Sequence, residues 1–240
     1  MGIAEDLART GVLRVSINLG NPVLAQGTPA APTGVTVDIA REVGARLGVP
    51  VELVCFDAAH RSFEALVSGT TDLCFLAIEP ARAESVAFTA PYVEIEGVYV
   101  VPDASPITGP ADVDRPGVRV AVNGGSAYDL FLTRTLREAT LVRGEDGIES
   151  FREQGLEAVA GIRQPMTAFV AENPDLRLVE ERFMAIRQAV GTTRDRSPAT
   201  VGFLGELVEE LKKTGFVADS LRRAGQADVT VAPPATPQTH

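Results

Sequence analysis

Short apolar runs alternate with amphipathic segments through the first part of the chain. Residues 34–47 carry Val37, Ile39 and Val43 at helical spacing, and Gly48 follows as a stop signal. The short apolar runs, rich in Val, Leu and Ile, predict strands over 12–17, 51–56, 72–78 and 86–88. Two shorter helices are predicted over 62–67 and 80–85, the second because proline suits a first helical position.

The same alternation resumes after a stretch punctuated by Pro102, Pro106 and Pro110. Predicted strands lie at 117–122, 140–143, 157–161 and 176–179, and predicted helices at 126–138, 147–154 and from Pro165 onward. Two β-rich segments, 94–101 and 184–190, flank this series, and helices are predicted over 198–213 and 216–224. From Val229 the chain is rich in Pro, Ala and Thr, which predicts a loosely ordered tail.

Alternating strands and helices predict parallel sheets with helices on both faces. Two such series joined by two β-rich crossings predict an α/β protein of two lobes with a double β-strand hinge. We assign residues 1–100 and 190–240 to the first lobe, and residues 101–189 to a second lobe inserted into it. Ligands of open α/β sheets bind at the carboxyl ends of the strands, so we expect the site in a cleft between the lobes.

Composition narrows the possible partners. The formal net charge is −10 over 240 residues, which argues against nucleic acid because binding phosphates needs a basic face. An apolar run of about 18 residues is absent from the sequence, so we expect no membrane span. The N-terminus lacks the basic start and apolar stretch of a secretory signal, so we expect either a processed leader or a cytoplasmic protein. A start at Met1 with no tag favours a natural beginning.

Candidate catalytic and metal-binding chemistry is sparse. Cys55 and Cys74 lie in predicted strands that another strand should separate, so we expect buried thiols and no disulfide. His60 and His240 are isolated in the sequence, and two scattered histidines do not make a metal site. The sequence has no Ser-His-Asp set, phosphate-binding glycine loop or metal-ligand spacing, so we expect no enzyme, metal or cofactor.

Six short segments along the chain form one pattern through their order and spacing. They are 11–15, 34–40, 63–69 with Asp72, Arg82 with 88–92, 120–122 with 125–127, and Phe216. Together, over residues 10–226, they resemble the family 3 solute-binding proteins of ABC importers. The resemblance implies the type II periplasmic-binding-protein fold and reversible capture of a small polar solute for a membrane permease. It further implies a periplasmic or extracellular location, and we expect a monomer.

The resemblance also implies ligand residues in the first lobe. Arg82 matches the arginine that forks onto a solute carboxylate, a geometry that suits the planar guanidinium. Asn18 and Asn21 follow the first strand and could offer amide hydrogen bonds or only form the loop. Ala77 ends the third predicted strand, and Glu79 stands where the family often has a small hydroxyl residue.

In the second lobe, Gly125 and Ser126 precede a helix whose N-terminus could accept an anion, although Ser126 could also be a plain cap. Amino-acid-binding members usually place an Asp after the third strand of this lobe. Arg163 stands near that position here, which favours an organic acid if it faces the cleft. Glu79 could instead hold an ammonium group, which keeps an amino acid open.

Two alternative functions remain on the same fold. A dehydratase acting on prephenate or arogenate would use Glu79 as a general acid. A cytoplasmic small-molecule sensor would explain the missing secretory signal.

Overall fold

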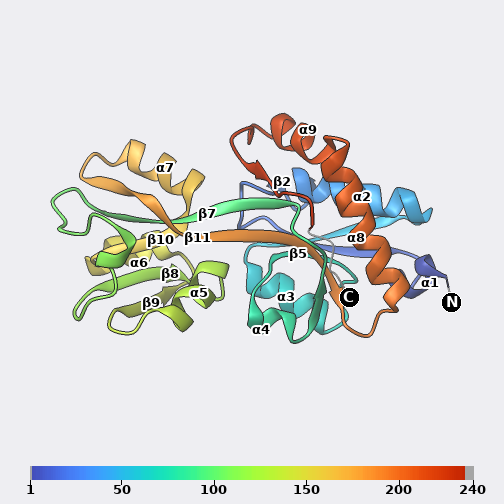
Figure 1. Cartoon of the computed structure of the whole chain (residues 1–240), viewed down its shortest axis with the longest axis horizontal. Coiled ribbons are helices and arrows are strands. Elements are labelled where there is room, and N and C mark those ends of the chain that lie inside the picture. The colour runs from blue at the N-terminus through green and yellow to red at the C-terminus, as the bar shows by residue number, and fades with distance from the viewer. Residues whose placement is uncertain (1, 236–240) are drawn as a thin grey trace. The chain divides into compact units, whose positions relative to one another are not determined.

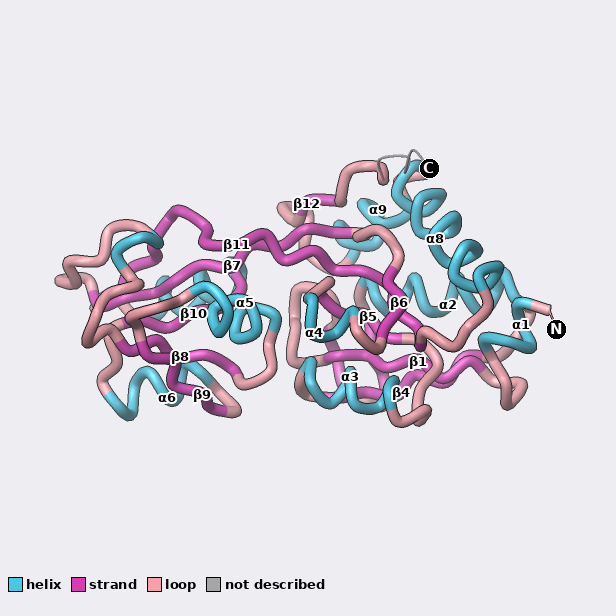
Figure 2. Tube along the Cα trace, turned by 60° about the horizontal axis from the view of Figure 1, so that its bottom comes forward, coloured by secondary structure: helices cyan, strands magenta, loops and turns pink. Residues whose placement is uncertain are grey.

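The structure, a computed structural model, describes residues 2–235. By its internal contacts the chain divides into two compact units. Unit 1 comprises Met1–Glu94 and Arg187–His240, and unit 2 comprises Ile95–Ile186. Two long strands, β7 (Val93–Pro102) and β11 (Leu176–Thr193), each contribute residues to both units and are neighbours in one sheet (Figure 2).

The strands of unit 1 surround β1 (Leu13–Asn18), which pairs in parallel with β4 (Val51–Phe56). A parallel bridge from Val15 to Leu73 places β5 (Cys74–Ala77) on the other side of β1. β5 pairs antiparallel with β11, which also pairs with β6 (Val86–Phe88). Because β1 lies between β4 and β5, the predicted separation of Cys55 and Cys74 is confirmed, and both thiols are free.

Helices cover both faces of these strands: α2 (Val35–Leu47) and α3 (Ala59–Val67) lie on opposite sides in Figure 1. α2 buries Val37, Ile39 and Val43 and ends at Gly48, whose φ of 67° is the left-handed geometry that glycine adopts without strain. The remaining elements of unit 1 are α1 (Ile3–Leu7), β2 (Gln26–Thr28), β3 (Ala31–Thr33), α4 (Pro80–Ala83), α8 (Pro198–Lys213), α9 (Phe216–Arg223) and β12 (Thr230–Val231).

In unit 2, β8 (Arg119–Asn123) lies between β10 (Ala158–Ile162) and β9 (Thr140–Gly144), all parallel and all in the same sheet as β7 and β11. β10 pairs antiparallel with β7. Its core joins strand residues to helix residues, among them Val100, Ala121, Phe151, Val159 and Met166. The other elements are a 3-10 turn (Pro110–Asp112), α5 (Ala127–Thr135), α6 (Gly147–Gln154) and α7 (Arg163–Glu172).

Three predicted boundaries were wrong. The strands predicted at 176–179 and 184–190 are one strand, β11, which lies beside β7 in the sheet. Of the intervening residues, the Glu180 carbonyl accepts from Arg163 of α7, and Arg182 donates to Glu96 of β7. α5 ends at Thr135, since the carboxylate of Asp114 accepts the N–H groups of residues 137–139 instead. The helix predicted over 62–67 begins earlier, at Ala59.

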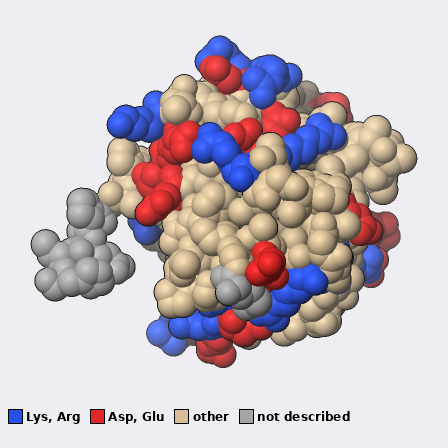
Figure 3. Space-filling view, turned by 90° about the vertical axis from the view of Figure 1, so that its right-hand side faces the viewer, with Lys and Arg blue, Asp and Glu red and all other residues tan. Residues whose placement is uncertain are grey.

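The predicted loose tail from Val229 was also wrong for the part that the structure describes. β12 pairs with Val93 and Glu94 of β7, and Ala232 is buried. Residues 236–240 lie outside the described residues. On the face drawn in Figure 3, acidic and basic side chains lie interspersed among uncharged ones.

Candidate functional site

The candidate residues of unit 1 begin at the carboxyl ends of β1 and β5, which run parallel and so end at the same edge of the sheet. Asn18 is the last residue of β1, and its Oδ1 accepts the N–H of Gly20 at 3.0 Å. Asn21 is buried, and its Oδ1 accepts the N–H of Val23 at 3.3 Å. Both side chains therefore shape the loop after β1, as asparagines commonly do in turns.

Ala77, Glu79 and Arg82 are brought together at the end of β5. Glu79 is the N-cap of α4, and its carbonyl accepts the N–H of Arg82 at 3.0 Å. Arg82 turns back so that its Nη1 donates to the Ala77 carbonyl at 3.4 Å. Glu79 and Arg82 are each 3% exposed, so a guanidinium and a carboxylate are both buried at this edge of the sheet.

The electrostatics of this cluster centre on Arg82. Burial lowers the pKa of Arg82, because it penalises the charged guanidinium, while the nearby Cys74 and Glu79 oppose that effect. Burial raises the pKa of the Cys74 thiol to about 12, so the thiol is neutral at physiological pH. Glu79 is the carboxyl group whose charge acts on Arg82, and a ligand carboxylate could form bidentate hydrogen bonds with the guanidinium.

In unit 2, Gly125 and Ser126 precede α5. Ser126 is the N-cap of this helix, as expected from its residue type, and its Oγ accepts the N–H of Asp129 at 3.1 Å. The carboxylate of Asp129 accepts the N–H of Gly125 at 2.9 Å and also bonds Arg143. Asp129 is buried, so a carboxylate of the chain itself already contacts this helix end.

Arg163 is the first residue of α7 and directly follows β10. Its Nε donates to Glu96 Oε2 at 2.5 Å, and its Nη2 donates to the Glu180 carbonyl at 2.6 Å. A longer ion pair of 3.6 Å reaches the Glu180 carboxylate. The charge of Arg163 is thus compensated by carboxylates within unit 2.

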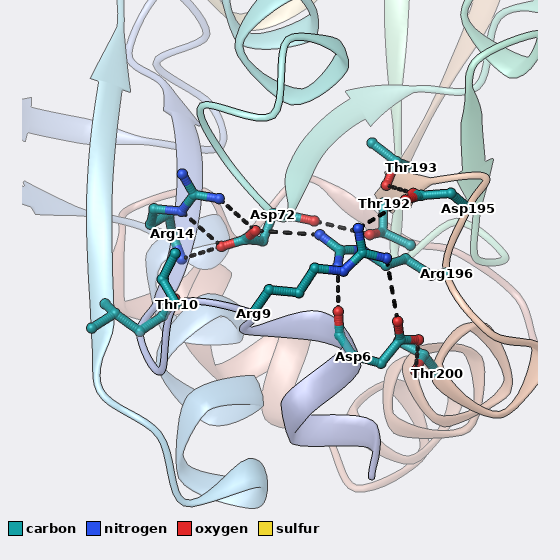
Figure 4. Close-up of polar contacts among 11 residues, drawn as sticks. Asp6, Arg9, Thr10, Arg14, Asp72, Thr192, Thr193, Asp195, Arg196 and Thr200 are labelled. Carbon is teal, nitrogen blue, oxygen red and sulfur yellow. Dashed lines mark hydrogen bonds and ion pairs between the residues drawn. The ribbon is translucent and has the colours of Figure 1, made fainter. Parts of the chain in front are cut away.

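Sequence reasoning missed a second polar cluster in unit 1, drawn in Figure 4. Asp72 accepts from the Nε and Nη2 of Arg14 at 3.1 and 2.8 Å, and from Arg196 Nη2 at 3.3 Å. Asp6 accepts from the Thr200 hydroxyl at 2.6 Å, and Arg196 donates to the Asp6 carbonyl. These partners lie up to 194 positions apart, so no local pattern could indicate the cluster.

The histidines do not form a metal site among the described residues. His60 lies in α3, and His240 lies outside the residues that the structure describes. Within residues 2–235, no group of three or more His, Cys, Asp or Glu is placed to hold a metal ion. The helices of the same residues include none long and apolar enough to cross a bilayer.

Comparison with known proteins supplies the family. A model of the bacterial extracellular solute-binding proteins, family 3, matches residues 13–226. A comparison with curated proteins finds no match.

Solved structures share the fold. A mutant of ArgBP from T. maritima is 23% identical, with a TM-score of 0.76 over 93% of this chain and 99% of that one. The amino acid ABC transporter substrate-binding protein AbpA from Streptococcus pneumoniae, bound to L-arginine, is 20% identical, with a TM-score of 0.76 over 93% and 98%. The ancestral amino acid-binding protein AncCDT-1, a precursor of cyclohexadienyl dehydratase, is 22% identical, with a TM-score of 0.74 over 93% and 98%. The predicted periplasmic-binding-protein-like type II fold is thereby confirmed.

Proposed function

Because the chain belongs to family 3 of the bacterial extracellular solute-binding proteins, we propose that it captures a small polar solute with a carboxylate for ABC-type import. The buried Arg82 is the observation that carries this proposal. The planar fork of donors on its guanidinium fits the two oxygens of a carboxylate. We propose that units 1 and 2 are the two lobes, that the solute binds between them, and that the protein acts as a monomer outside the cytoplasmic membrane.

An amino acid is the solute class that the polar groups favour. A dicarboxylate would need a second unpaired cation beside Arg82. Arg163 does not supply one, because it is paired with Glu96 and Glu180. Glu79 beside Arg82 supplies an anion that could hold an ammonium group while Arg82 holds the carboxylate. The structural neighbour AbpA is bound to L-arginine, which supports the same class.

The other proposed contacts lie at the ends of β1 and β5 and at the start of α5. Asn18, Asn21 and Ala77 lie at the edge of the sheet where β1 and β5 end. Gly125 and Ser126 begin α5, where Asp129 already accepts the amide of Gly125. For these residues we propose contact through backbone groups and the Ser126 hydroxyl.

The test is a thermal-shift and calorimetric screen of the common amino acids and of small organic acids. We expect one class of solute to raise the melting temperature, because a ligand that binds only the folded state stabilises it. Arg82→Lys keeps the charge but loses the fork, so we expect about a hundredfold weaker binding from the loss of a charge-assisted, bidentate contact.

Arg163→Ala is the matched variant, and it should leave the affinity for an amino acid within about threefold, since the proposal gives it no solute contact. A dicarboxylate that binds tightly to the unaltered protein and loses affinity in Arg163→Ala would replace the amino acid with an organic acid. No shift with any compound of the screen would refute the solute-binding proposal for these classes.

A dehydratase is a second candidate, because the buried Glu79 lies beside a carboxylate-binding arginine and one neighbour is described as a dehydratase precursor. Incubation with prephenate or arogenate, followed by absorbance, tests it. Turnover that is lost in Glu79→Gln would establish catalysis.

A further inference from the structure

A separate pocket of about 460 Å³ lies within unit 1, at the edge of the sheet where β1 and β5 begin. Arg14, near the start of β1, and Asp72, just before β5, both line it. A strand rises about 3.3 Å per residue, so the four residues from Arg14 to Asn18 span about 13 Å. The pocket therefore lies at the opposite ends of these strands from the proposed solute contacts, and its volume suits a small molecule.

Arginines gather in this pocket although the chain as a whole is acidic, with a net charge of −10. Four guanidinium groups line it, together with two carboxylates: Arg9, Arg14, Arg194 and Arg196, with Asp72 and Asp195. Arginine presents several N–H donors in one plane, a geometry that matches the oxygens of a phosphate.

The two carboxylates are already engaged by the chain. Asp72 is 2% exposed and is held by both Arg14 and Arg196 (Figure 4). Asp195 bonds Arg9 at 2.9 Å and the hydroxyl of Thr193. Asp6 pairs with Arg9, and the charge of Glu52 acts on Arg14, so Arg9, Arg14 and Arg196 all have carboxylate neighbours.

Arg194 and Arg196 keep N–H donors that bond no described residue. The Arg196 side chain is 5% exposed, and its Nε is buried without a hydrogen-bond partner among the described residues. Burial, the largest effect, and the neighbouring Arg9 lower the pKa of Arg196, and the charges of Asp72, Asp195 and Asp6 oppose them. Arg194 is exposed, donates to the Ala83 carbonyl at 2.7 Å, and has no ion pair with any residue in 2–235.

An apolar surface adjoins the arginines. Val67 lines the same pocket and is 48% exposed, and among the described residues it is the one large apolar side chain in the exposed class.

We propose that unit 1 binds a small organic phosphate in this pocket. The phosphate contacts Arg194 and Arg9, the buried charge of Arg196 adds attraction, and the organic part covers Val67.

The test is a titration of the full chain with phenyl phosphate, followed by backbone amide NMR at constant ionic strength. We expect saturable shifts at Gly69, Thr71 and Arg194. Arg194→Gln should weaken the affinity by at least about tenfold, because it removes charge-assisted hydrogen bonds to the phosphate at an exposed position. Arg41→Gln, an exposed arginine of α2 outside the pocket, should leave the affinity unchanged.

Val67→Ser tests the organic part of the ligand separately from the phosphate. It should weaken the affinity for phenyl phosphate several-fold and leave the affinity for inorganic phosphate unchanged. Equal affinity in Arg194→Gln and the unaltered protein would overturn the proposal, as would benzoate binding as tightly as phenyl phosphate. So would an equal effect of Val67→Ser on both phosphates. Phosphatidylcholine vesicles containing phosphatidic acid form a second arm, and sedimentation with them that Arg194→Gln abolishes would assign the phosphate to a lipid headgroup.

Discussion

Asp6 illustrates how single buried charges stabilise this protein. Its carboxylate accepts from the Thr200 hydroxyl at 2.6 Å and from the Ser197 N–H at 2.8 Å, which ties α1 to the start of α8. The Thr200 hydrogen bond is the largest of the effects that lower the pKa of Asp6 to about 2, and burial opposes it. A carboxyl whose pKa is lower in the folded chain stabilises the fold above its unfolded pKa, near 4.

We therefore expect Asp6→Asn to lower the free energy of unfolding at pH 7 by about 2 kcal/mol. The unaltered protein should lose the same contribution as the pH falls from about 4 to about 2, and the variant should lose less over that range. Urea unfolding at pH 7, 4 and 3 measures both effects. Asp57→Asn, at a side chain that is 72% exposed, is the control, and the same pH dependence in Asp6→Asn as in the unaltered protein would contradict the expectation.

The residue types of the candidate site could be anticipated, but their partners could not. Ser126 caps α5 as its residue type and position predicted. The pairing of Arg163 with Glu96, 67 positions away, depends on strands that meet only in the folded chain. A pattern that is local in sequence cannot report such a contact, and the solute contacts themselves stay predictions.

Among the elements, the helices with clear end signals were predicted best. α8 spans Pro198–Lys213 as expected, because Pro198 opens it and Ser197 caps it by accepting the N–H of Thr200 at 3.2 Å. The short hairpin of β2 and β3 was missed, since its strands of three residues carry no apolar alternation. The predicted boundaries were therefore most accurate where the sequence carries a clear start or stop signal.

Two helical glycines should respond oppositely to alanine. A Cβ at Gly44 would lie 2.1 Å from Val51 Cγ2 and 3.1 Å from the Val49 carbonyl, so the close packing of α2 on β4 requires glycine. A Cβ at Gly202 in α8 meets nothing within 4 Å. We expect Gly44→Ala to destabilise by about 1–3 kcal/mol through overpacking.

Gly202→Ala should stabilise by about 0.5–1 kcal/mol, because alanine costs less backbone entropy in a helix. Chemical denaturation of the two variants side by side measures the contrast. If both substitutions shifted stability in the same direction, packing against Val51 would not govern Gly44.

At the scale of the whole molecule, the order of strands and helices was enough to predict the α/β fold, and the family match over residues 13–226 agrees with it. What the order of elements could not predict is the extent of the shared strands. β11 is a single strand of 18 residues. Its charged middle stretch interrupts the apolar residues, so the hydrophobic pattern predicted two separate strands.

Because β7 and β11 contribute to both units, we expect the stability of the units to be coupled. Val159→Ala removes buried volume from the core of unit 2 at a cost of about 2 kcal/mol. Hydrogen exchange read by mass spectrometry should then show faster exchange in peptides of unit 1 as well, for example those covering β5. Faster exchange confined to unit 2, or an equal effect from the exposed Glu153→Gln, would contradict coupling.

The continuity of β11 also restricts how the length of this protein can vary. Side chains of a strand alternate between its two faces, so one inserted residue reverses the facing of everything beyond it. An insertion near Ile186 would move each of the residues that pair with β5, Gln188 to Gly191, to the opposite face of the sheet, and none of these residues would keep its present packing. Natural length variants should therefore cluster in the connecting loops and spare β11.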